Sequence, residues 1–177
     1  MDEIVNKVLS SGLIQIDLEE FYHKGERVVY DLKQNLYMEL ILKEKDFRDF
    51  LKTTDWELYR DKNVAIINTA DAIIPTWAYM LLATKLEKVA HKVVVGNLDD
   101  LEIALYNDYF STINTNDYLG AKVVIKGCSK VNIPNAVYYN LTKLLLPASQ
   151  SIMFGEPCST VPVYKLSPPR PSQKEGE

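Results

Sequence analysis

Cysteine and histidine are scarce in this chain of 177 residues, which contains two of each. Neither type is arranged as C-x₂-C or H-E-x-x-H, so the ligand spacings of the common zinc sites are absent. The seven glycines form no G-x-G-x-x-G run and no G-x-x-x-x-G-K-[ST] run. The sequence therefore offers no positive support for a standard zinc site or for the two common nucleotide-binding loops.

Positive charge and long apolar runs are also in short supply. The net charge of −4 argues against the basic face that collects nucleic-acid phosphates. No apolar run approaches the roughly 20 residues of a membrane span, and the start, MDEIVNKVLSSGL, lacks the features of a secretory signal. We therefore expect a cytoplasmic protein that binds neither nucleic acid nor membrane, and whose two cysteines stay reduced.

From residue 63 onward, short β-branched runs alternate with longer amphipathic segments. The runs predict strands near residues 64–68, 93–96, 123–126 and 151–154. Strands separated by helices are typical of a parallel sheet with right-handed crossovers. We therefore expect one mainly parallel α/β sheet, Rossmann-like and three-layered, with helices on both faces. No internal repeat is recognised.

The first 60 residues predict an α+β extension of that sheet. A short helix is expected near Asp2 to Ser10, strands in LIQIDLEEF and ERVVYDL, and a helix in KEKDFRDFLKTTD. Residues 167–177 contain almost no apolar side chain and are expected to be disordered. The domain prediction is thus a single α/β domain over residues 1–166 with a disordered tail.

Eight polar or thiol side chains follow the predicted strands at their carboxyl ends, where open parallel sheets bind their ligands. They are Asp71, Cys128, Ser129, Lys130, Glu156, Cys158, Ser159 and Thr160. Each cysteine comes after an apolar run and a glycine, and a glycine allows the backbone to approach a ligand closely. We therefore treat these eight residues as one candidate site.

Two interpretations of the cysteines stay open. As a site, Cys128 and Cys158 would lie on one sheet edge with their sulfurs roughly 4 to 10 Å apart, given strands about 4.8 Å apart. With Glu156 or Asp71 they could bind a metal, and thiolates favour zinc, copper(I) or iron. As packing residues, the thiols would instead behave as small buried hydrophobes. His91 precedes a predicted strand, at the opposite end of the sheet, so no cysteine–histidine dyad is expected.

Four phrases, LILKEKDFR, ADAIIPTWAYMLL, VVIKGCSK and SIMFGEPCSTVPVYK, resemble those of an uncharacterised bacterial family, domain of unknown function 2480. The resemblance covers nearly the whole chain up to Lys165 and implies no established activity. Relatives often accompany iron-sulfur assembly genes, which implies iron-sulfur assembly proteins as partners. The resemblance therefore favours a thiol or metal role, with zinc or iron as the cofactor.

Three functions remain in view, and whether the protein is an enzyme stays open. The first is a thiol- or metal-handling accessory factor linked to iron-sulfur maturation, with Cys128 and Cys158 as the reactive or metal-ligating pair. The second is a non-catalytic interaction module whose cysteines only pack. The third is a small-anion-binding protein or enzyme that uses backbone N–H groups of GCSK and EPCST.

Overall fold

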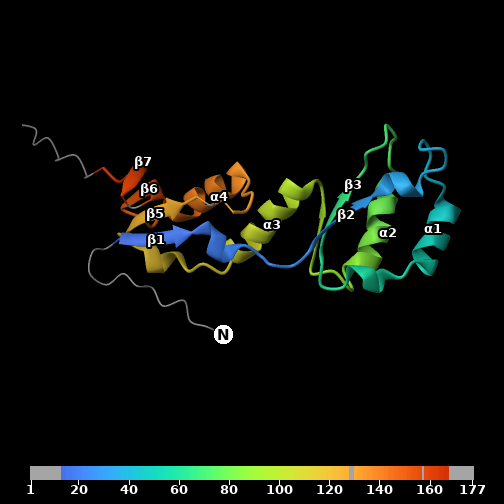
Figure 1. The fold of residues 1–177 in the computed structure, drawn as a ribbon, viewed down its shortest axis with the longest axis horizontal. Helices are drawn as coiled ribbons and strands as arrows, with labels where there is room; N and C mark the ends of the chain where they lie inside the picture. Colours follow the sequence, from blue (N-terminus) through green and yellow to red (C-terminus); the bar gives the residue numbers. More distant parts are fainter. Residues whose placement is uncertain (1–12, 128–129, 157, 168–177) are drawn as a thin grey trace, which may run out of the picture. The chain divides into compact units, whose positions relative to one another are not determined.

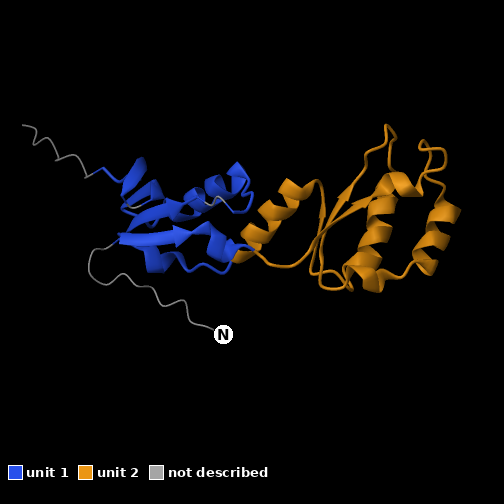
Figure 2. Ribbon diagram, viewed as in Figure 1, with its two compact units in different colours: residues 1–22, 110–177 blue, residues 23–109 orange. Residues whose placement is uncertain are grey.

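The structure is a computed structural model that describes residues 13–127, 130–156 and 158–167. The chain forms two compact units, coloured separately in Figure 2: unit 1 comprises residues 1–22 and 110–177, and unit 2 comprises residues 23–109. Each unit has its own sheet. The expectation of one continuous sheet is therefore wrong, although the mixed α/β character and the mostly parallel pairing are confirmed. The single domain over residues 1–166 stays a prediction.

Unit 2 is built on a parallel sheet of order β2-β3-β4, of which Figure 1 labels β2 and β3. The strands are β2 (Arg27–Asp31), β3 (Asn63–Ile67) and β4 (Lys92–Val95). The helices are α1 (Glu44–Thr53), α2 (Thr76–Leu86) and α3 (Leu98–Phe110), the last of which ends at the unit boundary. Apolar side chains of α1 and α2 pack with Val64 and Ile66, whereas Leu101 and Leu105 of α3 pack with Ala65. Alternate residues of β3 therefore bury against different helices, as the period of a strand requires.

Unit 1 has a four-stranded sheet of order β1-β5-β6-β7. The strands are β1 (Leu13–Asp17), β5 (Lys122–Lys126), β6 (Ser151–Glu156) and β7 (Ser159–Lys165), and the helix is α4 (Asn135–Leu145). β1, β5 and β6 run parallel, and β7 returns antiparallel to β6. The sequence did not predict β7 because Pro162 interrupts it, and proline is tolerated only at edge positions such as this one.

The elements predicted for the first 60 residues are confirmed where the structure describes them. β1, β2 and α1 form at LIQID, RVVYD and EKDFRDFLKT. They do not extend one sheet, because β1 pairs with β5 in unit 1 and β2 pairs with β3 in unit 2. The predicted helix near Asp2 to Ser10 and residues 168–177 of the tail lie outside the described residues. None of the described helices is long and apolar enough to cross a membrane.

The two units repeat one order of elements, which corrects the expectation that no internal repeat exists. In unit 2, β2 and η2 (Leu32–Asn35) are followed, after α1, by η3 (Trp56–Tyr59), β3, α2 and β4. In unit 1, β1 and η1 (Leu18–Phe21) are followed, after the whole of unit 2, by η4 (Thr115–Tyr118), β5, α4 and β6. Unit 2 is thus a second copy inserted into the first copy.

The correspondence between the two copies is exact in length. Positions that match from η3 to β4 and from η4 to β6 differ by 59 throughout, with no gap: Val64 matches Val123, Pro75 matches Pro134, Leu86 matches Leu145, and Gly96 matches Gly155. The first strands, β1 and β2, also match without a gap, but with an offset of 14. Asp17 matches Asp31, and each of these residues caps the 3₁₀ helix that follows it. Matching residues also share strand register, because Ile14 lies opposite Val123 and Val28 lies opposite Val64.

Candidate functional site

Three charged side chains meet where the parallel strands of unit 1 end. Asp17, Lys126 and Glu156 are the last residues of the neighbouring strands β1, β5 and β6. Lys126 Nζ lies 3.4 Å from Asp17 Oδ2 and 3.5 Å from Glu156 Oε2. The hydrogen bond to Asp17 and the charges of both carboxylates raise the pKa of Lys126. This edge therefore holds one fixed cation between two carboxylates.

A second ion pair lies at the same edge. Lys130, one of the predicted site residues, contacts Glu19 with its Nζ 2.9 Å from Oε1. Glu19 belongs to η1, whose first turn is fixed by Asp17, because the Asp17 carboxylate accepts a hydrogen bond from the Glu19 backbone N–H at 3.0 Å. Asp17 and Glu19 were not predicted as site residues, since both lie about a hundred positions away from Lys126 and Lys130 in the chain.

Cys158 lies in the turn of the β6–β7 hairpin and not in a loop between a strand and a helix. Glu156 pairs with Ser159, so only two residues connect the strands, and Cys158 is exposed with a free thiol. Gly155 has φ +120°, and a Cβ at this position would lie 2.7 Å from the Ser159 carbonyl oxygen. Glycine is thus required directly before the turn that presents the thiol.

The other predicted site residues are distributed as follows. Ser159 and Thr160 begin β7, with Thr160 Oγ1 3.7 Å from Met153 Sδ. Asp71 follows β3 in unit 2, so it does not share a sheet edge with the unit 1 residues, contrary to expectation. Cys128 and Ser129 lie outside the described residues, and the predicted sulfur–sulfur distance stays a prediction. Within the described part of the chain, no three His, Cys, Asp or Glu side chains group to hold a metal.

An apolar groove of ≈ 600 Å³ lies beside β6 in unit 1. Its walls come from α4 and from the strands β5, β6 and β7. They are formed by Ile125, Ile133, Asn135, Tyr138, Tyr139, Thr142, Ile152, Met153, Phe154 and Val163. The Tyr138 and Phe154 rings meet edge to face with centroids 5.7 Å apart. None of the lining residues is charged, and Tyr139 is 70% exposed. This groove was not predicted from the sequence, because one of its walls includes Val163 of β7, a strand that Pro162 obscures.

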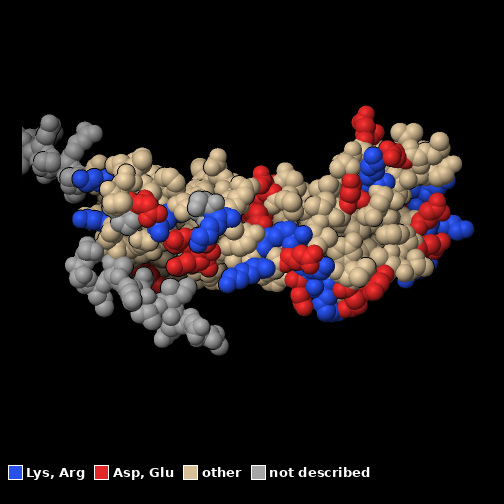
Figure 3. All heavy atoms as spheres, viewed as in Figure 1, with Lys and Arg blue, Asp and Glu red and all other residues tan. Residues whose placement is uncertain are grey.

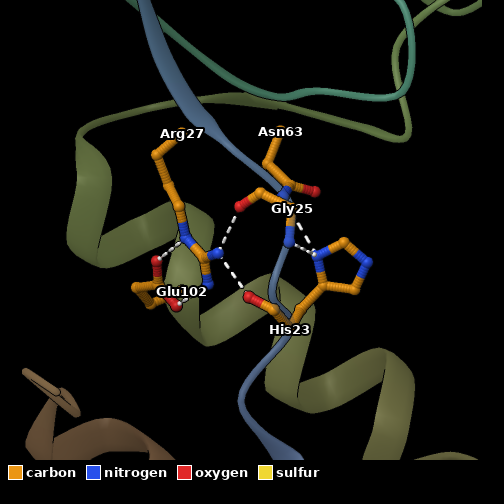
Figure 4. Close-up of polar contacts among 5 residues, drawn as sticks. All are labelled: His23, Gly25, Arg27, Asn63 and Glu102. Atoms are coloured by element: carbon orange, nitrogen blue, oxygen red, sulfur yellow. Dashed lines mark hydrogen bonds and ion pairs between the residues drawn. The ribbon is translucent and has the colours of Figure 1, made fainter. Parts of the chain in front are cut away.

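A buried polar cluster occupies the amino end of the sheet in unit 2 (Figure 4). Arg27 and Asn63 are the first residues of β2 and β3. The Arg27 guanidinium binds both Glu102 oxygens, at 2.6 and 2.9 Å, and also donates to the carbonyl oxygens of His23 and Gly25. The two side chains of this ion pair are only 14% and 10% exposed. The cluster therefore joins the start of β2 to α3.

His23 contacts two neighbours of this cluster through its Nδ1. Its Nδ1 lies 3.1 Å from both the Gly25 backbone N–H and the Asn63 amide nitrogen, so Nδ1 accepts and carries no proton. Its ring also stacks on His91, with centroids 4.2 Å apart. Burial, then the neighbouring His91 and Arg27, lower the pKa of His23. The two histidines thus meet at the amino end of the sheet, away from the carboxyl ends of the strands.

Surface charge is mixed in sign. On the face that Figure 3 shows, Lys and Arg side chains are interspersed with Asp and Glu side chains. Among the described residues, several surface charges are paired, including Lys92 with Asp108 and Lys62 with Glu26. This face therefore carries no broad field of a single sign.

Comparison with known proteins gives one result. The model of the family described as "Protein of unknown function (DUF2480)" matches residues 2–166. No curated protein and no solved structure is significantly similar to the chain. Because the match covers nearly the whole chain, the protein belongs to the DUF2480 family of unknown function.

Proposed function

We propose that the protein is a thiol-presenting accessory factor that binds an apolar segment of a partner polypeptide in the groove of unit 1. The observation that carries this proposal is the groove itself, whose walls contain aromatic and aliphatic side chains and no charge. Exposed apolar surface of this kind marks interaction sites in soluble proteins. The occupant is a segment whose buried face is apolar.

A polypeptide suits this surface better than a small molecule, because the apolar area continues beyond the groove. Val161, next to the groove on β7, is 62% exposed, and Leu146, at the end of α4, is 38% exposed. A small ligand would be covered by the groove walls alone. A partner segment would also cover these flanking side chains.

Cys158 supplies the chemical group of the proposed function. It lies in the hairpin turn directly beyond β6, the strand that contributes Phe154 to the groove wall. A segment bound in the groove would have an exposed, free thiol close to one end. Its thiolate can attack a disulfide of the partner, which forms a mixed disulfide and releases the partner's other sulfur as a thiolate. It can instead add one ligand to zinc or iron that the partner holds. Iron-sulfur assembly proteins, implied by the family resemblance, are the first partners to test.

The experiment measures binding to a purified iron-sulfur scaffold protein by isothermal titration calorimetry. Phe154→Lys places a charge in the groove and is expected to abolish binding. Ile73→Lys is the matched control, because Ile73 is 93% exposed in unit 2 and the variant should bind like the parent. Cys158→Ser should keep binding but prevent any metal or disulfide exchange. Equal binding by the Phe154→Lys variant and the parent would exclude the groove as the binding site.

A further inference from the structure

The internal repeat shows a strand position that is filled in unit 1 and open in unit 2. β6 and β4 are matching strands, since Ile152 corresponds to Val93 and Phe154 to Val95. In unit 1 the outer side of β6 pairs with β7. In unit 2 the sheet ends at β4, which pairs only with β3 among the described residues. At the opposite edge each sheet ends in a matching strand, β1 in unit 1 and β2 in unit 2. The two sheets therefore differ in their strands at the edge beyond β6 and β4.

The backbone groups that this edge offers follow from the pairing of β4 with β3. Lys92 and Gly96 donate their N–H groups to the carbonyl oxygens of Lys62 and Ile66. Because successive residues of a strand point their backbone groups to opposite sides, Val93 and Val95 direct theirs away from β3. Their counterparts in β6, Ile152 and Phe154, lie opposite Tyr164 and Val161 of β7. β4 thus directs the same backbone N–H and C=O groups outward as β6 does, but no strand that corresponds to β7 pairs with them among the described residues.

The edge of unit 1 has two devices against further pairing that the β4 edge lacks. β7 contains Pro162, and its pairing with β6 is irregular between Ile152 and Met153. Proline and bulges are the usual means by which edge strands avoid unwanted partners. β4 has the sequence KVVV, with neither device, and Val95 is 62% exposed. Such an edge is suited to strand addition.

We propose that β4 pairs with β4 of a second copy of this chain, antiparallel about a two-fold axis through Val94. In this register Val93 of one chain exchanges both backbone hydrogen bonds with Val95 of the other, so every outward group of the strand is used. The only charged residue of β4 is Lys92, and Asp108 contacts its Nζ at 2.6 and 2.8 Å. The pairing therefore brings no unneutralised like charges together.

Apolar surface beside the strand adds to this interface. Met80 on α2 is 66% exposed. Its counterpart in unit 1 is Tyr139, which lines the groove beside β6 and β7. By this correspondence Met80 flanks the outer side of β4, where a strand from a second copy would cover it together with Val95. The proposed interface involves only unit 2, and it does not depend on the proposed function of the unit 1 groove.

The test measures mass and amide exchange of the full-length chain. Sedimentation velocity at increasing protein concentration should show a monomer–dimer equilibrium, and the Val93 and Val95 amides should exchange more slowly as the dimer forms. Val95→Pro removes one outward N–H from each chain and leaves the bonds to β3, so dimerisation should weaken by about tenfold or more. Val95→Ala, which keeps the N–H, should weaken it less.

Three results would overturn the inference. They are a monomer at every concentration, a dimer in which the Val93 and Val95 amides exchange at the monomer rate, or a Val95→Pro dimer as tight as the parent. Circular dichroism establishes that each variant is folded before its mass is interpreted. Amide exchange in the parent protein needs no variant, so the proposal remains testable if Val95→Pro fails to fold.

Discussion

Removing the carboxylate of Glu102 should destabilise the protein far more than removing a surface carboxylate. In the Glu102→Gln variant the Arg27 guanidinium loses its counter-ion while its side chain stays about as buried as before, at 14% exposed. Breaking a buried ion pair from one side costs roughly 3–5 kcal/mol, because the remaining charge is uncompensated. Arg27 keeps the carbonyl oxygens of His23 and Gly25 as acceptors. We therefore expect a loss at or just below the lower end of this range, about 2–3 kcal/mol.

The assay is urea unfolding followed by circular dichroism. Glu57→Gln is the matched control, since Glu57 pairs with Arg60 on the exposed surface and its loss should leave the unfolding midpoint almost unchanged. The double variant Arg27→Met with Glu102→Leu should be more stable than Glu102→Gln, because no charge remains buried. A loss below about 1 kcal/mol for Glu102→Gln, the scale of a surface pair, would refute the reasoning.

Three further outcomes are expected. The pKa of His23 in the folded protein is lowered from 6.5, so the stability that this residue contributes is complete above pH 6.5 and is lost as pH falls toward the lowered pKa. Urea unfolding midpoints measured at each pH should therefore fall over this interval for the parent, and they should fall less for His23→Gln. Gly155→Ala should cost about 1–3 kcal/mol, more than Gly120→Ala, whose added Cβ meets open space; equal melting temperatures would contradict this. Cys158→Ser should change stability by less than about 0.5 kcal/mol, because the thiol is exposed; a larger loss in the same assay would indicate packing.

Local pattern was sufficient to predict the position of most elements. In β1 the alternation of Ile14 and Ile16 with polar residues matches their burial, at 9% and 3% exposed. Helix α4 begins directly after Pro134 and buries Val137 and Leu141 on one stripe. These signals depend only on near neighbours in the chain, so a sequence contains them in full.

The membership of each strand in a sheet could not be predicted in the same way. β1 pairs with β5, with Leu13 opposite Lys122, whereas β2, much closer in sequence, belongs to the other sheet. Alternation of apolar residues determines which face of a strand is buried and carries no information about which strand lies beside it. Consecutive elements of a chain usually lie side by side, which is why one sheet was expected for all the parallel strands. Because unit 2 is inserted after β1, consecutive strands such as β1 and β2 belong to different sheets.

The repeat is difficult to predict from the sequence for a related reason. The first strand of the outer copy is separated from the rest of that copy by the whole of unit 2, so a search for consecutive repeats does not align it. Most matching positions are not identical, and pairs such as Ile152 and Val93 share only apolar character. The same separation explains the charged edge of unit 1, where Asp17 meets Lys126 only because β1 and β5 are neighbours.

The buried cluster of unit 2 is explained by this inserted arrangement. An inserted unit needs its entry and exit segments close together, so that the host copy can close around both connections. The entry segment of unit 2 contains His23 and Arg27, and the exit helix α3 contains Glu102. The Arg27–Glu102 pair joins these two segments directly, and the bonds from His23 to Gly25 and Asn63 fix the entry segment to the sheet. The cluster therefore closes the inserted copy, which is why removal of one carboxylate is expected to weaken the whole unit.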